Sequence, residues 1–133
     1  MSRYKLYILF TAALMAVALA ACGPDKTKTG QAVNMTGNAE AGKQVYVDFC
    51  ASCHGPEGTG GVPNPGSDDG TVPALNPIDE EFNSVATMDL VIEHGSTPEG
   101  SNPSVLMPAF GDKKLMTPQQ IADVMAYILS LSK

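Results

Sequence analysis

Residues 37–54 read GNAEAGKQVYVDFCASCH, and this stretch decides how the rest of the chain folds. Asn38 is a good N-cap residue, and the apolar residues after it predict a helix that runs to the two cysteines. Cys50 and Cys53 are three positions apart, so a helical turn places both thiols on roughly one face. His54 follows directly. The stretch therefore predicts a helix that presents two thiols and an imidazole together.

The Cys-x-x-Cys-His motif at residues 50–54 is the attachment signature of c-type haem. The two thiols can add to the two vinyl groups along one edge of a haem, and the adjacent imidazole then lies beneath the iron. We therefore expect one covalently bound haem c, attached at Cys50 and Cys53, with His54 as an axial ligand. A small, loop-rich fold with ten prolines and no tryptophan needs such a group to stabilise its core.

Other uses of two cysteines and a histidine fit this chain less well. A structural zinc site needs four ligands, but only His94 remains after the motif and there is no second pair of cysteines. A thioredoxin-like redox motif would belong to a βαβ pattern, which the sequence lacks. A simple disulfide would leave the adjacent histidine without a role. The motif thus favours haem.

A low-spin electron carrier needs a second axial ligand, and we expect Met107 to supply it. Pro108 favours an extended conformation at Met107, and the 53-residue separation from His54 lets the chain wrap around the haem. A thioether ligand favours ferrous iron and raises the reduction potential. His94 is the alternative ligand, although at a helix C-terminus we interpret it as a solvated side chain favoured by the helix dipole. The remaining mature methionines are assigned to packing, to a helix start or to the linker: Met116, Met125, Met88 and Met35.

Two long loops and a short helix are expected after the motif. Residues 55–77 are rich in glycine, proline, serine and aspartate and predict a loop. A short helix is expected over residues 87–94, with Gly95 as its left-handed stop. Residues 96–106 form a second loop, which is either a partner-specific surface near the haem edge or a tolerated surface insertion.

The final helix has the clearest signals in the chain. Thr117 and Gln120 predict a capping box, Pro118 takes the first helical position, and Met116 and Ile121 stand where a hydrophobic staple would be. Apolar residues then recur at helical spacing and make one face. We predict an all-α domain of three to four helices with long loops.

The N-terminal residues predict export and a lipid anchor. Arg3 and Lys5 precede an apolar run over residues 6–20, as in a secretory signal peptide. Residues 19–22, Leu-Ala-Ala-Cys, resemble the lipobox of bacterial lipoproteins, which are cut before a cysteine that is then acylated. An ordinary signal peptide cut near residue 21 and an uncut anchor are the alternatives. We expect a signal peptide at residues 1–21, a lipidated Cys22 with a flexible tether at 22–36, and a domain at 37–133.

The mature chain is acidic. Removal of Arg3 and Lys5 leaves six basic residues against fourteen acidic ones, a net charge of −8. This charge argues against nucleic acid and for redox partners that present Lys or Arg on a basic docking surface. About 14 flexible residues span on the order of 20 Å, which would let an anchored domain move between neighbouring complexes.

Three separate stretches resemble class I cytochromes c, in the order of that family. Residues 37–54 look like the first helix and haem site, residues 107–111 (MPAFG) like the axial-methionine loop, and residues 115–131 (LMTPQQIADVMAYILSL) like the last helix. The resemblance implies the cytochrome c fold around one covalent haem. It also implies that a glycine and an aromatic of the first helix cross the last helix near its aromatic. The matching positions are Gly42, Tyr46 and Tyr127.

The resemblance further implies a proline whose carbonyl accepts the Nδ1–H of the proximal His54 and fixes the ring. Pro73 is the best match, and Pro63 and Pro65 are the alternatives because the loop is longer than in compact members.

Together these features predict a membrane-tethered monohaem carrier of single electrons, exported and facing the periplasm or the cell exterior. It would not be an enzyme and would have no small-molecule substrate. A fixed electron-transfer subunit of an oxidase, a quinol-oxidising complex or a dehydrogenase is the alternative.

Overall fold

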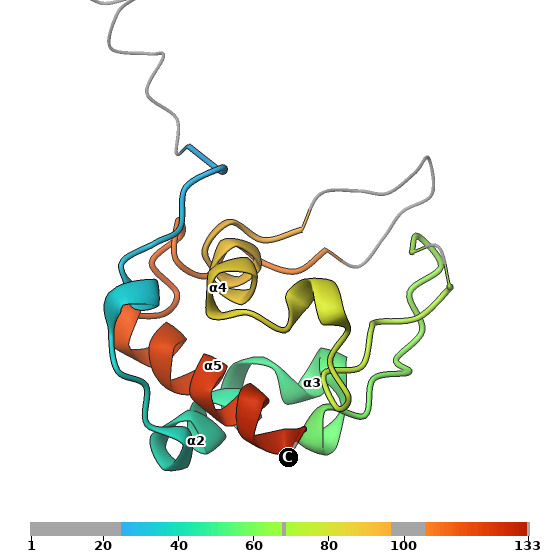
Figure 1. Cartoon of the computed structure of the whole chain (residues 1–133). Helices are drawn as coiled ribbons and strands as arrows, with labels where there is room; N and C mark the ends of the chain where they lie inside the picture. The colour runs from blue at the N-terminus through green and yellow to red at the C-terminus, as the bar shows by residue number, and fades with distance from the viewer. Residues whose placement is uncertain (1–24, 68, 97–105, 133) are drawn as a thin grey trace, which may run out of the picture.

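The computed structural model describes residues 25–67, 69–96 and 106–132 (Figure 1). The helices are α2 (Ala39–Phe49), α3 (Ala51–His54), α4 (Val85–His94) and α5 (Pro118–Leu131), with 3-10 turns η2 (Ala32–Asn34), η3 (Pro56–Gly58) and η4 (Glu80–Phe82). Within these residues there is no strand, only an isolated bridge between Pro63 and Thr71. The expected all-α fold is confirmed. The predicted leader, Cys22 and most of the 96–106 loop lie outside the described residues.

The local signals set the helix ends as expected in two cases and differ in a third. The Asn38 side chain caps α2 by accepting hydrogen bonds from the amides of residues 40 and 41, and Thr117 and Gln120 form the predicted capping box of α5. The helix α4 begins at Val85, two residues before its expected start, because Ser84 accepts a hydrogen bond from the amide of residue 87. Gly95 ends α4 with φ 71° and ψ 178°, a positive φ outside the left-handed helical region that was expected.

The first and last long helices cross in close contact. A Cβ atom at Gly42 would collide with the backbone carbonyl of Asp123 on α5, so the crossing requires glycine there. The Tyr46 and Tyr127 rings pack beside it, with centroids 5.3 Å apart and planes tilted by 55°. The crossing expected at these three positions is therefore confirmed, and it closes one side of the molecule (Figure 1).

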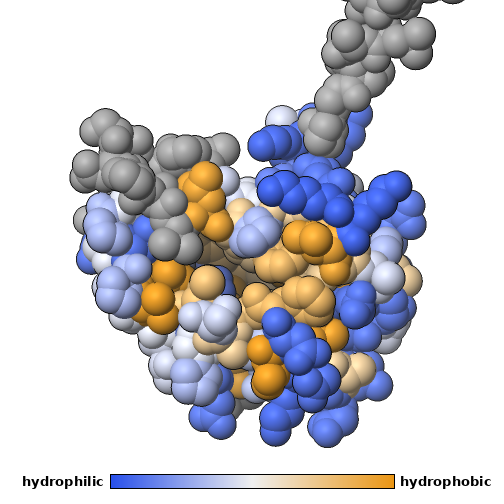
Figure 2. Space-filling view, turned by 180° about the vertical axis from the view of Figure 1, so that it is seen from behind, coloured by the Kyte–Doolittle hydropathy of each residue, from blue (hydrophilic) through white to orange (hydrophobic). Residues whose placement is uncertain are grey.

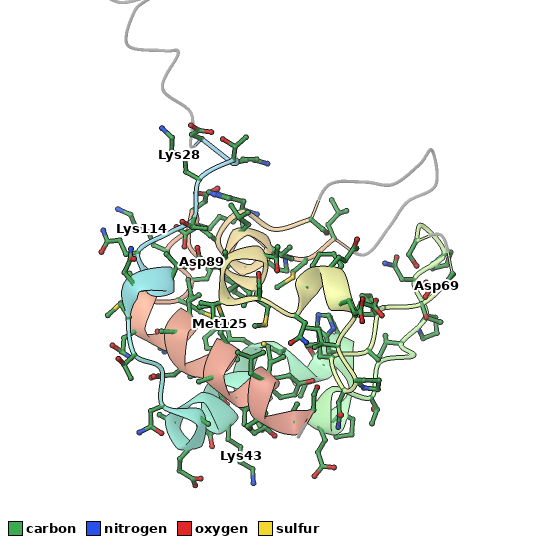
Figure 3. The ribbon with its side chains drawn as sticks, viewed as in Figure 1. Lys28, Lys43, Asp69, Asp89, Lys114 and Met125 are labelled. Atoms are coloured by element: carbon green, nitrogen blue, oxygen red, sulfur yellow. The ribbon has the colours of Figure 1, made fainter. Side chains whose placement is uncertain are left out.

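The core lies between α5, α2 and α4. Ile121, Val124, Met125 and Ile128 of α5 are buried, as is Met116, so the assignment of Met116 and Met125 to packing is confirmed. Met125 lies inside the fold whereas Lys43 of α2 points away from it (Figure 3). No helix of the described residues has both the length and the apolar character needed to cross a membrane.

Residues 28–36 correct the expectation of a flexible tether, because they pack on the domain. Ala32 is fully buried, and η2 contacts both α4 and α5. The Gly30 amide donates to Asp89, and the Thr36 carbonyl accepts from Gln119. This docking uses backbone groups and one small side chain, so a pattern of polar side chains could not reveal it.

Candidate haem site

A large cavity opens on one face of the domain (Figure 2). Its volume is about 780 Å³, within the roughly 300–1,000 Å³ usual for small-molecule and cofactor sites. Apolar side chains from three separate parts of the chain line it: Val72, Leu75, Ile78, Met88, Phe110 and Met116. Such a wall binds a large apolar group and excludes water from it.

The four side chains predicted to attach or ligate the haem reach this cavity or the small hollow beside it. Cys50, His54 and Met107 line the large cavity. A second hollow of about 50 Å³ is lined by the same three residues and by Cys53. The structure therefore brings together, at one place, a motif on α3 and a methionine 53 residues later in the chain.

The short helix α3 and the loop after it orient His54. The His54 amide donates to the Cys50 carbonyl over 2.9 Å, and the Gly60 amide donates to the His54 carbonyl over 2.7 Å. His54 Nδ1 lies 3.0 Å from the Pro73 carbonyl oxygen, which can only accept, so Nδ1 carries the hydrogen. This arrangement leaves the lone pair on Nε2. Pro63, by contrast, lies in the bridge with Thr71.

Burial keeps His54 and Cys50 uncharged. Desolvation lowers the pKa of His54, against the opposing effect of its bond to Pro73, so the ring is neutral at pH 7 and can act as a ligand. Burial, and then the neighbouring Cys53, raises the pKa of the Cys50 thiol to about 12. Thiol redox chemistry needs an accessible thiolate, so this environment argues against a thioredoxin-like role. Among the described residues, no group of three or more Cys, His, Asp or Glu side chains could hold a metal ion.

Hydrogen bonds to Ser96, two residues after the end of α4, hold the Met107 backbone in place. The Met107 amide donates to Ser96 Oγ over 2.9 Å, and the Ser96 amide donates to the Met107 carbonyl over 3.2 Å. A Cβ atom at Gly95 would meet the Met107 carbonyl oxygen at 2.5 Å, so glycine permits this approach. The Met107 side chain is half-buried. Of the other methionines, Met35 is 39% exposed whereas Met88 is buried in the cavity wall.

His94 differs from both interpretations that the sequence suggested. Its side chain is 9% exposed, so it is not a solvated residue. Nδ1 lies 3.0 Å from an Asp112 carboxylate oxygen, and Nε2 lies 2.8 Å from the Lys28 carbonyl oxygen. With both ring nitrogens engaged, it has no lone pair to offer as an axial ligand.

One supporting contact was missed by the sequence analysis. The Tyr46 hydroxyl donates to the Gly55 carbonyl over 2.8 Å, directly after the motif, and burial raises the pKa of this phenol to about 12. Tyr46 was expected to pack on α5, and nothing in the local sequence indicates that its hydroxyl also holds the start of the 55–77 loop.

These residues fit a covalently held haem. Two thiols stand beside a neutral imidazole whose Nδ1 is already bonded, a thioether lines the same space, and the remaining wall is apolar. Those are the groups that covalent attachment and two-sided ligation of a haem iron require. Cys50 and Cys53 would attach it, and His54 and Met107 would lie on its two faces.

Known proteins resemble the chain over the part that forms this site. The family model for Cytochrome c matches residues 39–132. Cytochrome c6 of Rippkaea orientalis (strain PCC 8801 / RF-1) is 35% identical over 96 residues, covering 72% of this chain and 73% of that protein. The fructose dehydrogenase cytochrome subunit of Gluconobacter japonicus is 36% identical over 96 residues, covering 67% of this chain and 18% of that subunit. No solved structure matches the chain significantly.

Proposed function

The chain belongs to the cytochrome c family, and from that premise we propose that it is a membrane-tethered monohaem cytochrome that passes single electrons between redox complexes. Membership implies covalently bound haem c and a role in electron transfer. The observation that carries the proposal is the shared cavity, where the motif residues and Met107 meet against an apolar wall. When bound, haem c supplies one iron that accepts and returns a single electron.

Each site residue has a distinct task in this proposal. Cys50 and Cys53 would form the thioether links, and His54 would offer Nε2 to the iron while the Pro73 carbonyl fixes its ring. Met107 would offer its sulfur as the second ligand. Because the Ser96 contacts hold the Met107 backbone, little has to move when the charge at the site changes.

The surroundings of the site suit a carrier rather than an enzyme. The lining is largely apolar, and a site with two axial ligands leaves no open position for a substrate. The expected net charge of −8 favours partners with basic docking surfaces. Acylation of Cys22 would keep the exported domain at a bacterial membrane, facing the periplasm or the cell exterior. With residues 28–36 docked, only about six residues would link Cys22 to the domain, a reach of roughly 15 Å.

A fixed subunit of a larger enzyme is the second candidate. Its support is the similarity to a cytochrome subunit of fructose dehydrogenase, whose length this chain matches only in small part. The short free tether also suits a protein that stays near one partner. Extraction of membranes with detergent at high salt separates the candidates: a mobile carrier elutes alone, whereas a subunit elutes with its complex.

The ligand assignment is tested by Met107→Ala. We expect the sulfur-to-iron charge-transfer absorption to disappear and the reduction potential to fall, because a thioether favours ferrous iron. Absorption spectra and a redox titration of the purified holoprotein measure both. Met35→Ala is the matched control, because Met35 is 39% exposed and does not line the cavity. An unchanged spectrum and potential in Met107→Ala would refute the assignment.

A further inference from the structure

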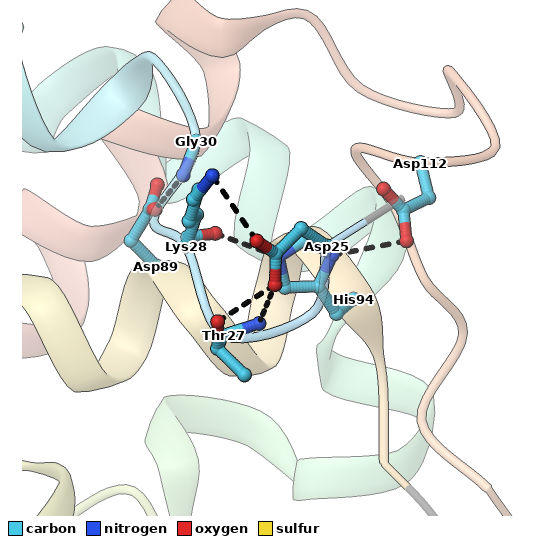
Figure 4. Close-up of polar contacts among 7 residues, drawn as sticks. All are labelled: Asp25, Thr27, Lys28, Gly30, Asp89, His94 and Asp112. Atoms are coloured by element: carbon cyan, nitrogen blue, oxygen red, sulfur yellow. Dashed lines mark hydrogen bonds and ion pairs between the residues drawn. The ribbon is translucent and has the colours of Figure 1, made fainter. Parts of the chain in front are cut away.

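His94 joins three segments that are far apart in the sequence (Figure 4). It is the last residue of α4, its Nε2 faces the Lys28 carbonyl 66 residues earlier, and its Nδ1 faces the Asp112 carboxylate 18 residues later. Residues 25–36 are called the N-terminal segment here, and residues 106–116 the methionine loop. The ring thus lies between the chain that leads to Cys22 and the loop that carries Met107.

Both partners of the ring are acceptors. A backbone carbonyl has no hydrogen to donate, and a carboxylate has none either. A neutral imidazole carries one N–H and can therefore satisfy only one of the two. The observed pair of bonds, 3.0 and 2.8 Å long, requires hydrogens on both nitrogens, which is the imidazolium form. Loss of its proton must release either Asp112 or the Lys28 carbonyl.

The surrounding charges favour the cation. The ionisable groups that face His94 come from the N-terminal segment, from α4 and from the methionine loop: Asp25, Lys28, Asp89, Glu93 and Asp112. Four of the five are acids, and Lys28 is itself paired with Asp25 over 3.2 Å. The bond to the Lys28 carbonyl, and then the bond to Asp112, raises the pKa of His94 above its ordinary value near 6.5. The C-terminal end of α4 also favours a positive charge.

Further hydrogen bonds attach both segments to α4 around this ring. The Gly30 amide donates to Asp89 Oδ2 over 2.5 Å, which docks the N-terminal segment. The Asp112 amide donates to the Glu93 carbonyl over 3.0 Å, which docks the methionine loop. The Glu93 side chain also fills the space beside Gly30 and Gly111, one glycine from each segment. The two segments are therefore held by neighbouring residues of α4, so a displacement of one segment changes the contacts of the other.

We propose that His94 is a positioning residue that, as an imidazolium, couples the docking of the N-terminal segment to the position of the methionine loop. Loss of its proton frees one of the two segments. While the ring is protonated, the N-terminal segment is held on the domain and the Met107 backbone is held against the end of α4. Once the ring has lost its proton, the free length between Cys22 and the domain increases, or the methionine loop loosens.

This inference rests on the proposed function only for the roles of Cys22 and Met107. The coupling between the two segments can be measured without either role. An unchanged spectrum in Met107→Ala would overturn the ligand assignment and would leave the result of the titration below as it stands.

Titration of the His94 ring by nuclear magnetic resonance in the reduced holoprotein tests the proposal. We expect a midpoint above the ordinary histidine value of about 6.5. Amide hydrogen exchange of Gly30 and Asp112, expressed as protection factors, should be followed through the same pH range. Protection of at least one of these amides should fall about tenfold or more through that midpoint. The reason is that deprotonation removes one hydrogen bond from the charged His94 ring to the segment that contains that amide. A midpoint at or below the ordinary value would overturn the proposal, and so would unchanged protection of both amides.

Two variants and a control complete the test. In Asp112→Asn the midpoint of His94 should fall, because the ring loses its carboxylate partner. In His94→Gln protection should be low at every pH with no midpoint, since a glutamine amide can donate to only one of the two acceptors. Asp48→Asn is the matched control: it makes the same charge change on α2, where Asp48 accepts from Gln44 over 2.9 Å. An equal midpoint shift in Asp48→Asn and Asp112→Asn would contradict a specific pair. If His94→Gln does not fold, the proposal is tested by the wild-type titration and by the midpoint of His94 in Asp112→Asn.

Discussion

Two junctions close this domain, and they use different kinds of contact. The helix crossing joins α2 to α5 through Gly42, the Asp123 carbonyl and the paired rings of Tyr46 and Tyr127. The histidine junction joins the N-terminal segment and the methionine loop to α4 through His94 and its two acceptors. Close approach and aromatic packing hold the first, together with one hydrogen bond of 2.8 Å from the Asn38 amide to the Asp123 carboxylate, whereas only hydrogen bonds of a charged ring hold the second.

The two kinds of contact differ in whether a proton takes part in them. The crossing depends mainly on close backbone approach at Gly42 and on two packed rings. The histidine junction depends on a proton, and it contacts the two segments that lead to the expected anchor and the expected axial ligand. The proposed response to pH is therefore confined to the histidine junction, which contacts the loop that carries Met107.

The largest effect is expected at the helix crossing. Gly42→Val places a branched side chain against the Asp123 carbonyl, which cannot move without separating α2 from α5. We expect the free energy of unfolding to fall by about 3 kcal/mol, the upper part of the range for overpacking a core. Chemical denaturation followed by circular dichroism measures it. Lys43→Ala, the next residue on the exposed side of α2, should change stability by less than about 0.5 kcal/mol. Equal losses in the two variants would show that the crossing is not tight.

An intermediate loss of stability is expected at Tyr46, which packs at the helix crossing and also bonds the loop after the haem motif. Tyr46→Phe removes the hydroxyl that bonds the Gly55 carbonyl and should cost about 1.5 kcal/mol. Because burial raises the pKa of this phenol to about 12, the hydroxyl donates throughout the range from pH 6 to 9, and the loss should not vary with pH there. Tyr127→Phe keeps the ring contact and serves as the control. A loss that grows or shrinks across this range would argue against a simple neutral hydrogen bond.

The smallest effect is expected at the histidine junction, where the free energy of unfolding should depend on pH rather than fall by a fixed amount. The folded pKa of His94 is raised above its unfolded value, so its contribution is fully present below about pH 6.5 and is lost as pH rises through the folded pKa. One group cannot produce a slope above about 1.4 kcal/mol per pH unit. Stability measured at several pH values should therefore decline with rising pH in the wild type and in Tyr46→Phe.

In His94→Gln the part of that slope due to the histidine should be absent. The comparison with wild type is needed because burial also raises the pKa values of Asp89 and Glu93, and both contributions are likewise lost as pH rises. The same slope with and without the histidine would mean that these carboxyls, and not His94, set the pH dependence.

Much of the fold could be predicted because its signals are local. A capping box, an N-cap asparagine and apolar residues at helical spacing act within a few residues of one another, so α2 and α5 were predicted with the correct caps. The start of α4 was placed two residues late because the competing cap, Ser84, was overlooked. The docking of residues 28–36 was missed because it depends on backbone groups, which every sequence contains.

The amino-acid sequence by itself determined the chemistry of the site. A Cys-x-x-Cys-His motif on a helix turn and a methionine before a proline specify which atoms are available, since reactivity belongs to residue types and their spacing. Only the tertiary structure decided which distant groups meet. It selected the Pro73 carbonyl for His54, and it gave His94 two acceptors from segments 66 residues before it and 18 after it. Such pairings arise from how loops close and pack around the core, which no local pattern records.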